Sequence, residues 1–317
     1  MKKLKVAVLG SGNIGTDLMI KALRSPLLEC TAFVGRNLSS AGMAKAQSLG
    51  VRVSAQSISY FVNNPDCCDL VFDATSARDH LVHAPILEKL GKMVVDLTPA
   101  KIGPMCVPAV NILELLNEKN VNMVTCGGQA SIPVAYALGQ THSDIEYIEV
   151  ISSIASRSAG PATRANLDEY IHTTESGLKK FSGASRTKAI LNLNPAQPCI
   201  NMQTTMLAKV ANPDIAKFKT VLDDVIARVQ KYVPGYELLV GPTVENGRIV
   251  VMVRVKGLGD YLPAYAGNLD IINCAALAIA EEVSKSRQDK AEVGESTTAQ
   301  TVTPNVKGGK LHAIRTH

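Results

Sequence analysis

The feature that most constrains the fold is a glycine-rich turn near the start of the chain. The apolar segment 5–9 runs directly into Gly10-Ser11-Gly12-Asn13-Ile14-Gly15, and residues 16–23 have a helical pattern. In such a strand–turn–helix unit, the first glycine makes the turn and the second lets a pyrophosphate approach the backbone, while the third permits close helix–strand packing. The helix N-terminus then faces the phosphates. The sequence therefore predicts a Rossmann dinucleotide-binding domain.

Apolar strands and helical segments alternate through the first part of the chain. Strands are expected at 5–9, 30–34, 68–75, 92–98 and 121–125, and helices at 16–23, 37–49, 77–90 and 112–120. This alternation is typical of an α/β doubly wound parallel sheet, which binds ligands beyond the carboxyl ends of its strands. We expect residues 1–130 to form this NAD-binding domain, completed by an apolar helix at 270–283.

The pattern changes after about residue 144. Residues 145–154 are rich in β-formers, a helical segment follows at 167–181, and Asn246-Gly247 joins two apolar runs as in a β-hairpin. We expect residues 131–269 to form an α+β dimerisation and substrate domain with an antiparallel sheet. Residues 284–317 are rich in Ser, Thr, Lys and Gln, so we expect a disordered tail.

A cysteine ends the strand expected at 121–125. Cys126 is followed by Gly127-Gly128, which we expect to turn the chain before a helix that begins near Ile132, with Pro133 in its first turn. A helix N-terminus that faces a thiol favours the nucleophilic thiolate. Many cysteines are simply small buried hydrophobes, so both interpretations stay open at this point.

The end of the second expected strand bears on the choice of coenzyme. An acidic residue that binds the ribose 2′-hydroxyl is usual there in NAD-binding domains, but this chain has Arg36. An arginine there can accommodate a 2′-phosphate, so NADP is possible as a weaker coenzyme than NAD; a solvated surface arginine is the alternative.

Composition excludes several classes of protein. No apolar run reaches the length of a membrane span, and the run at 6–9 is too short for a secretion signal, so we expect a cytoplasmic protein. The seven cysteines include no CxxC pair, which indicates neither a disulfide framework nor a metal site. The net charge of +5 comes without a basic run interleaved with aromatics, so nucleic-acid binding is not expected.

Several segments together resemble one family, the acylating acetaldehyde dehydrogenases of bacterial aromatic meta-cleavage pathways. These enzymes oxidise acetaldehyde to acetyl-CoA with NAD and coenzyme A. The resemblance extends from residue 4 to about residue 283. It is carried by GSGNIGTDLMIKALR (10–24), VFDATSARDH (71–80), DLTPAKIGPMCVPAVN (96–111), NVNMVTCGGQASIP (120–133), SAGPATRANLDEYIHTTE (158–175), YVPGY (232–236) and YLPAYAGNLDI (261–271).

The resemblance implies a role for each of these segments. Cys126 corresponds to the cysteine that carries the acyl thioester, and Asn268 to one NAD-binding position. Two further NAD-binding segments are implied: Ser11, Gly12, Asn13 and Ile14, and then Ser158, Ala159, Gly160, Pro161, Ala162, Thr163, Arg164, Ala165 and Asn166. The family's fold is similar to that of glyceraldehyde-3-phosphate dehydrogenase. A homodimer through the second domain and a complex with 4-hydroxy-2-oxovalerate aldolase are also implied.

Two departures from the family pattern leave questions open. Gln203-Thr204 occupies the place where many members have an acidic residue that has been assigned a role in activating the thiol, and the stretch 242–255 is shorter than in many members. The mode of thiol activation is therefore open. We expect backbone N–H groups near Cys126 and the amide of Asn166 to stabilise an alkoxide, and we expect His142 and His172 to be packing or surface residues.

Two rival functions remain at the level of sequence. One is a phosphorylating semialdehyde or acyl-phosphate reductase on the same scaffold, which would need a phosphate pocket and usually a catalytic histidine. The other is a non-catalytic NAD-binding redox sensor that uses Cys126 as its switch. Aldehyde oxidation with CoA as the acyl acceptor separates both from the family's activity.

Overall fold

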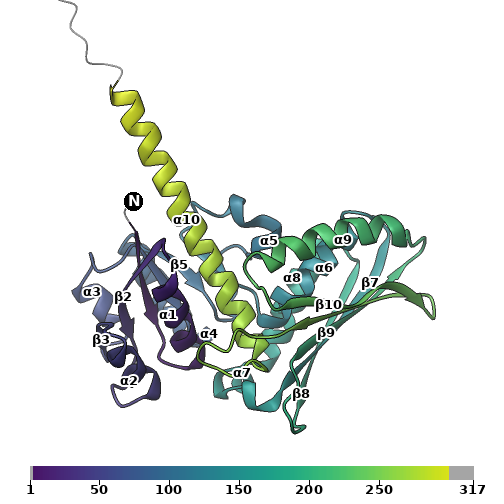
Figure 1. Cartoon of the computed structure of the whole chain (residues 1–317), viewed down its shortest axis with the longest axis horizontal. Coiled ribbons are helices and arrows are strands. Elements are labelled where there is room, and N and C mark those ends of the chain that lie inside the picture. The colour runs from purple at the N-terminus through teal and green to yellow at the C-terminus, as the bar shows by residue number, and fades with distance from the viewer. Residues whose placement is uncertain (1–2, 300–317) are drawn as a thin grey trace, which may run out of the picture.

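The computed structural model describes residues 3–299, without the side chains of residues 161–162 and 291–299. Two β-sheets lie side by side, and the long helix α10 (Gly267–Ala299) starts between them and runs along the first domain (Figure 1). The chain passes from the first sheet to the second through α6 (Cys126–Gly139) and returns to the first through α10. The ends of these two helices frame the candidate site.

The first sheet is the predicted Rossmann sheet. Its six strands pair in the order β3-β2-β1-β4-β5-β6, and every pair is parallel. The strands are β1 (Leu4–Leu9), β2 (Leu28–Val34), β3 (Val53–Ser54), β4 (Leu70–Asp73), β5 (Met93–Asp96) and β6 (Asn120–Asn122). The helices between them are α1 (Asn13–Arg24), α2 (Ala41–Ser48), α3 (Ser59–Asn63) and α4 (Ala77–Lys89). Strands β4 and β5 are buried along their whole length, because helices cover both faces of a parallel sheet.

The second sheet differs in one respect from the expectation of an antiparallel sheet. Its order is β10-β11-β9-β7-β8, and β7 and β8 are parallel, so the sheet is mixed. Helix α8 (Leu167–Ser182) forms the crossover that parallel neighbours require. The strands are β7 (Ile145–Ala155), β8 (Arg186–Asn194), β9 (Met202–Val210), β10 (Tyr236–Glu245) and β11 (Arg248–Val255).

Helices cover one face of this second sheet. Helices α6, α8 and α9 (Ile215–Gln230) lie on the same side of it in Figure 1. Buried and more exposed residues alternate along β9 and β11, as expected for strands with one face against a core and the other turned outward. The sequence therefore specifies an inner face, which carries the domain's core, and an outer face.

The helix expected at 112–120 is wrong. The structure has only α5 (Pro108–Asn111) and the 3₁₀ turn η1 (Ile112–Glu114) there. The side chain of Asn111 binds the backbone of its own turn: its Oδ1 accepts from Val107 N at 3.0 Å, and its Nδ2 donates to Met105 O at 3.0 Å. Local side-chain bonds of this kind compete with a continuing helix.

The tail expected from residue 284 is wrong for residues 284–299, which continue α10. Ser284 is buried and donates to Leu27 O at 3.1 Å, and Lys290 Nζ donates to Asn117 Oδ1 at 3.1 Å. A polar segment can extend an existing helix because the costly nucleation step has already been made. Residues 300–317 lie outside the described part of the chain.

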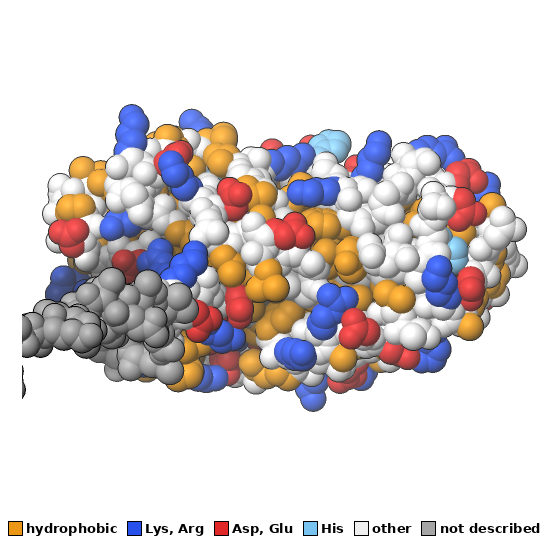
Figure 2. All heavy atoms as spheres, turned by 90° about the horizontal axis from the view of Figure 1, so that it is seen from above, with side chains coloured by type: hydrophobic (Ala, Val, Ile, Leu, Met, Phe, Trp, Pro, Cys, Tyr) orange, Lys and Arg blue, Asp and Glu red, His pale blue; other side chains and the backbone are white. Residues whose placement is uncertain are grey.

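Two further features of the described structure are the character of its helices and the distribution of its surface charges. Within residues 3–299, no helix combines the length and the apolar character needed to cross a membrane. On the face shown in Figure 2, the lysines and arginines are interspersed with aspartates and glutamates.

Candidate active site

Two adjoining pockets form one groove beyond the carboxyl ends of the parallel strands. The first has a volume of about 740 Å³ and extends from Arg36 past the glycine turn. The second contains Cys126 and Asn268. Thr75, Ser76 and Asn166 line both, so a ligand that lies along the turn can reach the cysteine. That edge of a doubly wound sheet is the usual place for a ligand.

The glycines of the turn are explained by close contacts. Gly10 has φ +119°, and a Cβ on it would lie 2.5 Å from Ala74 O. A Cβ on Gly15 would overlap Gly10 O, whereas a Cβ on Gly12 would point into open space. The turn and the close packing therefore require Gly10 and Gly15, and Gly12 leaves the backbone accessible to a ligand.

The other residues of the turn lie around the start of α1. Ser11 lines the groove and Ile14 lines the cysteine pocket, while Asn13 is exposed at the first position of the helix. No side chain caps this helix at Gly12, so its first N–H groups face the groove without a side-chain acceptor from that residue. A helix end of this kind favours an anionic ligand.

Arg36 lines the far end of the groove. Its side chain is 80% exposed, and its Nη1 lies 3.9 Å from Oδ2 of Asp79 in the first turn of α4. An acidic group is therefore present near this end of the groove, although it comes from α4 and not from the end of β2. The role of Arg36 in coenzyme choice stays a prediction.

The segment from Ser158 to Asn166 is only partly turned toward the groove. Thr163, Ala165 and Asn166 line it. Ser158 instead donates to Ala155 O at 2.8 Å, and the guanidinium of Arg164 donates to backbone oxygens of the preceding turn. The remaining members of the segment are Ala159, which is buried, Gly160, which caps α7 (Pro161–Ala165), and Pro161 and Ala162, whose side chains lie outside the described structure.

Asn268 is the second residue of α10 and is fully buried at the wall of the cysteine pocket. Neither its Nδ2 nor its Oδ1 has a hydrogen-bond partner among the described residues. An unpaired buried amide costs free energy, so a polar ligand group that satisfied it would be bound favourably.

Helix α6 begins at Cys126, earlier than the sequence indicated. The expected glycine turn before a helix at Ile132 is wrong, because Gly127 and Gly128 belong to the first turn and Pro133 lies inside the helix. Thr125 caps the helix by accepting from Gly128 N at 2.8 Å. The cysteine therefore stands at the positive end of its own helix.

A left-handed residue sets this early start. Val124 has φ +62°, which is rare for a β-branched residue and costs about 1–3 kcal/mol. Asn122 holds it there: its Oδ1 accepts from Val124 N at 2.9 Å, and its Nδ2 donates to Asp96 Oδ2 at 2.9 Å. The buried polar contacts of β5 and β6 thus direct the backbone that carries Cys126.

Tyr170, which sequence reasoning missed, places a polar group beside the sulfur. Its hydroxyl lies 3.7 Å from Cys126 Sγ. Burial raises the pKa of the Cys126 thiol, while the Tyr170 hydroxyl and the N–H groups of Gly127 and Cys126 act in the opposite direction. Tyr170 is four residues after Asn166, and that helical spacing was the available signal.

The two histidines considered from the sequence lie elsewhere. His142 Nε2 accepts from Asp214 N at 2.9 Å, and its ring packs edge-on against Phe218. The side chain of His172 is 68% exposed, and its Nδ1 lies 3.7 Å from Glu175. Both are packing or surface residues, as expected.

A buried cluster beneath the groove was also missed. Asp73 Oδ2 lies 2.9 Å from both His80 Nδ1 and His83 Nδ1, and His80 Nε2 lies 3.4 Å from Asp96 Oδ2. Burial raises the pKa of Asp73, but the hydrogen bonds of the two histidines outweigh it and hold that pKa at about 2. Burial raises the pKa of Asp96 to about 6, against the opposing effect of His80.

A Rossmann domain joined to a mixed-sheet domain, with a groove between them, defines a two-domain dehydrogenase fold. Aspartate semialdehyde dehydrogenase from Candida albicans, whose structure contains NADP, has this fold: it superposes with a TM-score of 0.61 at 13% identity and covers 89% of this chain and 100% of its own. At that identity the likeness shows the fold alone.

The sequence comparisons are more specific. Residues 126–263 match the dimerisation domain of prokaryotic acetaldehyde dehydrogenase. The acetaldehyde dehydrogenase of Spirochaeta aurantia is 66% identical over 289 residues, which are 91% of this chain and 97% of that protein. The protein of the same name from Pectobacterium atrosepticum is 57% identical over 291 residues, or 91% and 98% of the two chains. The chain belongs to the acetaldehyde dehydrogenase family and is an enzyme of that class.

Proposed function

We propose that this enzyme oxidises acetaldehyde and other short aldehydes to the acyl-CoA with NAD and coenzyme A through a thioester on Cys126. One observation carries the proposal: Cys126 stands at the N-terminus of α6, at the inner end of a groove that continues along the glycine turn. A thiol beside a dinucleotide groove has the arrangement that aldehyde oxidation requires.

The groove residues fit a nicotinamide dinucleotide. The N-terminus of α1 and the accessible backbone at Gly12 would hold the pyrophosphate. The unpaired amide of Asn268, in the pocket of Cys126, would bind the carboxamide of the nicotinamide ring. Bound NAD supplies the acceptor for the hydride. NADP is proposed as a weaker coenzyme, because Arg36 lines the far end of the groove.

The chain's own groups support each covalent step. The Cys126 thiolate attacks the aldehyde carbon and forms a C–S bond, and the carbonyl electron pair moves to oxygen. The N-terminus of α6 and the amide of Asn166 stabilise that alkoxide. When the alkoxide collapses, the hydride leaves carbon with its electron pair and a thioester remains on Cys126. The thiolate of CoA then attacks the thioester and releases the cysteine.

The lining of the cysteine pocket supports a small, weakly polar aldehyde. Leu97, Pro99, Leu269 and Ile272 provide apolar parts of the wall of the pocket that contains Cys126. Among the described residues that line this pocket, none is an arginine, lysine or histidine that would pair with an acidic substrate. Acetaldehyde has no charged group to satisfy, so this lining suits it.

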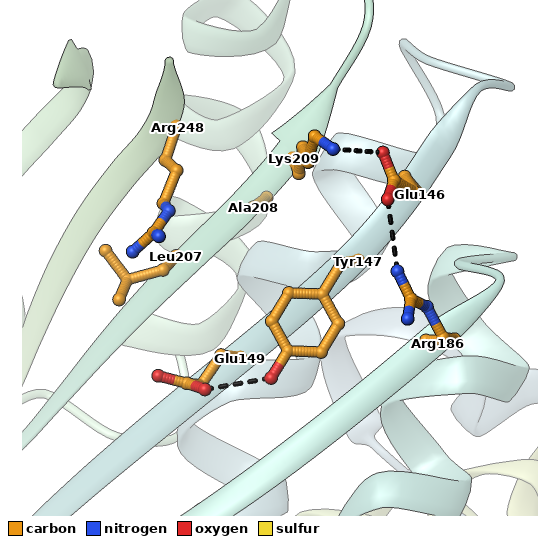
Figure 3. Close-up of a pocket in the computed structure, with 8 residues that line it drawn as sticks. All are labelled: Glu146, Tyr147, Glu149, Arg186, Leu207, Ala208, Lys209 and Arg248. Atoms are coloured by element: carbon orange, nitrogen blue, oxygen red, sulfur yellow. Dashed lines mark hydrogen bonds and ion pairs between the residues drawn. The ribbon is translucent and has the colours of Figure 1, made fainter. Parts of the chain in front are cut away.

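The matched dimerisation domain indicates a homodimer. We propose that the outer face of the second sheet is the contact surface. Figure 3 shows part of that face: Glu146 of β7 pairs with Lys209 of β9 at 2.7 Å and with Arg186 of β8 at 3.0 Å, and Tyr147 donates to Glu149 at 2.8 Å. Charges that are already paired within one chain cost less to cover with a second chain than unpaired charges would.

We also propose that the enzyme acts in the cytoplasm on acetaldehyde that a 4-hydroxy-2-oxovalerate aldolase produces, as the last step of aromatic meta-cleavage catabolism. The family resemblance is the support for this context. Co-expression with the cognate aldolase, followed by size-exclusion chromatography, tests the complex. Separate elution of the two proteins at micromolar concentration would count against it.

The thioester is tested without CoA. Enzyme mixed with acetaldehyde and NAD alone should release a burst of about one NADH per active subunit. Intact mass should then show an added acetyl group on the Cys126 peptide. Cys126→Ser should lose the burst and keep NAD binding, whereas Cys199→Ser should keep both. A burst that survives in Cys126→Ser would refute the assignment.

The same assay separates the rival functions. CoA should restore steady turnover, and inorganic phosphate should not. Turnover with phosphate would identify a phosphorylating reductase, and NAD binding without any aldehyde oxidation would identify a redox sensor.

A further inference from the structure

Three hydroxyl groups form a buried line that leads away from the sulfur of Cys126. The Tyr170 hydroxyl lies 3.7 Å from Sγ, and the Ser152 hydroxyl lies beside the same position of Gly127 as the Tyr170 hydroxyl, where it acts to lower the pKa of Tyr170. Ser152 Oγ lies 3.0 Å from Thr204 Oγ1. Tyr170 is 7%, Ser152 3% and Thr204 2% exposed, so the line is shielded from water over its whole length.

The two sheet residues are held in place by strand pairing. Ser152 of β7 and Thr204 of β9 are direct partners in the antiparallel ladder, and both lie on the inner face, beneath the helices. Their neighbours Ser153 and Gln203 are also partners and lie on the outer face. Of the pair Gln203-Thr204, only Thr204 therefore belongs to the line that leads to the cysteine.

Gly127 leaves the space that this line needs. A Cβ on Gly127 would overlap the Tyr170 hydroxyl and would lie 3.1 Å from Ser152 Oγ. The first turn of α6 thus requires a glycine at this point, although glycine disfavours a helix. The first of the two glycines after Cys126 is therefore explained by the Tyr170 hydroxyl, which needs that space beside the sulfur.

In the described structure, the groups that face the thiol are these hydroxyls and not charged side chains. Among the described residues that line the cysteine pocket, Cys126 and Tyr170 are the titratable ones. Asp168 and Glu169 of α8 are exposed, and Asp270 of α10 is bound to Lys21 at 2.8 Å. Glu146 and Glu149 of β7 face outward. The described neighbours therefore present neither a carboxylate nor a histidine to the thiol.

The Tyr170 phenol stays protonated at neutral pH and can therefore donate to the sulfur. Burial and the neighbouring Cys126 raise the pKa of Tyr170 well above its ordinary value, so the phenol keeps its proton. A protonated phenol beside sulfur donates to the thiolate. Ser152 can donate to the phenol oxygen and Thr204 to Ser152, and a chain of donors that points one way polarises each bond in it.

We propose that the hydroxyls of Tyr170, Ser152 and Thr204 form a donor chain that stabilises the Cys126 thiolate in place of an acidic or histidine partner. Tyr170 is a catalytic residue in this scheme because it contacts the reacting sulfur, and Ser152 and Thr204 are positioning residues that act through it. The thiol proton leaves to solvent water, and every hydroxyl keeps its own proton. The proposal rests on the proposed role of Cys126 as the nucleophile.

The test measures the acidity of the thiol and does not use the aldehyde. Full-length enzyme is alkylated with iodoacetamide over a range of pH, and the rate is followed by mass spectrometry on the Cys126 peptide. Tyr170→Phe should raise the apparent thiol pKa by about one to two units, as expected when a thiolate loses one charge-assisted hydrogen bond. At pH 7, its alkylation rate should fall about tenfold or more.

Thr204 offers a matched pair of variants. Thr204→Val keeps the shape and removes the hydroxyl, so it should raise the thiol pKa by a few tenths of a unit. Thr204→Ser keeps the hydroxyl and should match the wild type. If Thr204 had only a structural role, both changes should shift the thiol pKa alike. Both variants should bind NAD like the wild type, because Thr204 lies outside the groove.

Two outcomes would overturn the proposal. One is an unchanged thiol pKa in a folded Tyr170→Phe enzyme; the other is an equal shift in Thr204→Val and Thr204→Ser. If Tyr170→Phe does not fold, the Thr204 pair decides alone. Failure of the proposed function would look different, because the NADH burst would then survive in Cys126→Ser whatever the thiol pKa.

Discussion

The buried Lys21 joins three elements around the site and gives the sharpest prediction about stability. Its Nζ lies 2.9 Å from Asp17 of α1, 2.8 Å from Asp260 in the loop before α10 and 2.8 Å from Asp270 of α10. The side chain of Lys21 is 3% exposed, and those of the three aspartates are 8% exposed or less. Lys21→Met keeps a similar apolar stem and removes the charge.

The magnitude follows from what remains after the substitution. Asp260 keeps Arg24, and Asp17 keeps the amide of Asn273 at 2.8 Å, but both lose a buried cation, as does Asp270. Removal of one partner from a buried ion pair costs about 3–5 kcal/mol. At about 2 °C per kcal/mol for a chain of this size, the thermal midpoint should fall by about 6–10 °C.

Helix α9 offers a matched control. Lys219 and Asp223 also form an ion pair four residues apart, at 2.6 Å, but their side chains are 58% and 52% exposed. Lys219→Met should cost less than about 0.5 kcal/mol. Thermal unfolding followed by circular dichroism compares the two variants. Equal midpoints for Lys21→Met and Lys219→Met would refute the view that the buried cluster fastens α10 to α1.

Three further predictions concern the groove and the cluster beneath it. Gly127→Ala should lower kcat at least about tenfold, because the added methyl group displaces the Tyr170 hydroxyl, even though alanine favours the helix by about 1 kcal/mol. Steady-state kinetics check this, with Gly241→Ala as the control because a Cβ there meets open space. Arg36→Ala should lower kcat/KM for NADP more than for NAD, and an equal loss for both would remove Arg36 from the ribose site. Because the folded pKa of Asp96 is raised to about 6, its contribution to stability is complete below pH 4 and is lost as the pH rises through 6. In urea unfolding, this group should make the free energy of unfolding of the wild type fall between pH 4 and 6. The Asp96→Asn variant should lack that part of the fall.

The fold was predictable wherever short-range pattern and topology agree. The glycine turn and the alternation after it indicated the parallel sheet, because both follow from local sequence and from the rules for parallel strands. The sequence did not predict β9, nor the parallel pairing of β7 with β8, because strand partners are chosen by contacts distant in the chain. The polar end of α10 was misjudged because composition alone does not show that a helix already formed can continue.

Several residues of the candidate site could be singled out from the sequence, but the contacts that support them could not. Cys126 could be singled out because it follows a strand and precedes glycines. Tyr170 and the left-handed Val124 could not, since one depends on the packing of α8 against α6 and the other on a side chain of β6. Sequence patterns report which residue types are present at an edge; which of them touch is decided by tertiary structure.

The route of the chain limits how the groove can open. The backbone crosses from the Rossmann sheet to the second sheet at α6 and returns at α10, so two covalent connections bridge the domains. A hinge motion of the domains would have to bend both connections about one axis. In addition, α10 is bound to α1 by Lys21 and by the Asn273 amide, which donates to Ile14 O at 3.1 Å. We therefore expect the groove between the domains to change little in width when a ligand binds. Ligand binding should appear in solution scattering as an unchanged radius of gyration, and in hydrogen exchange as local protection of the segment 158–166.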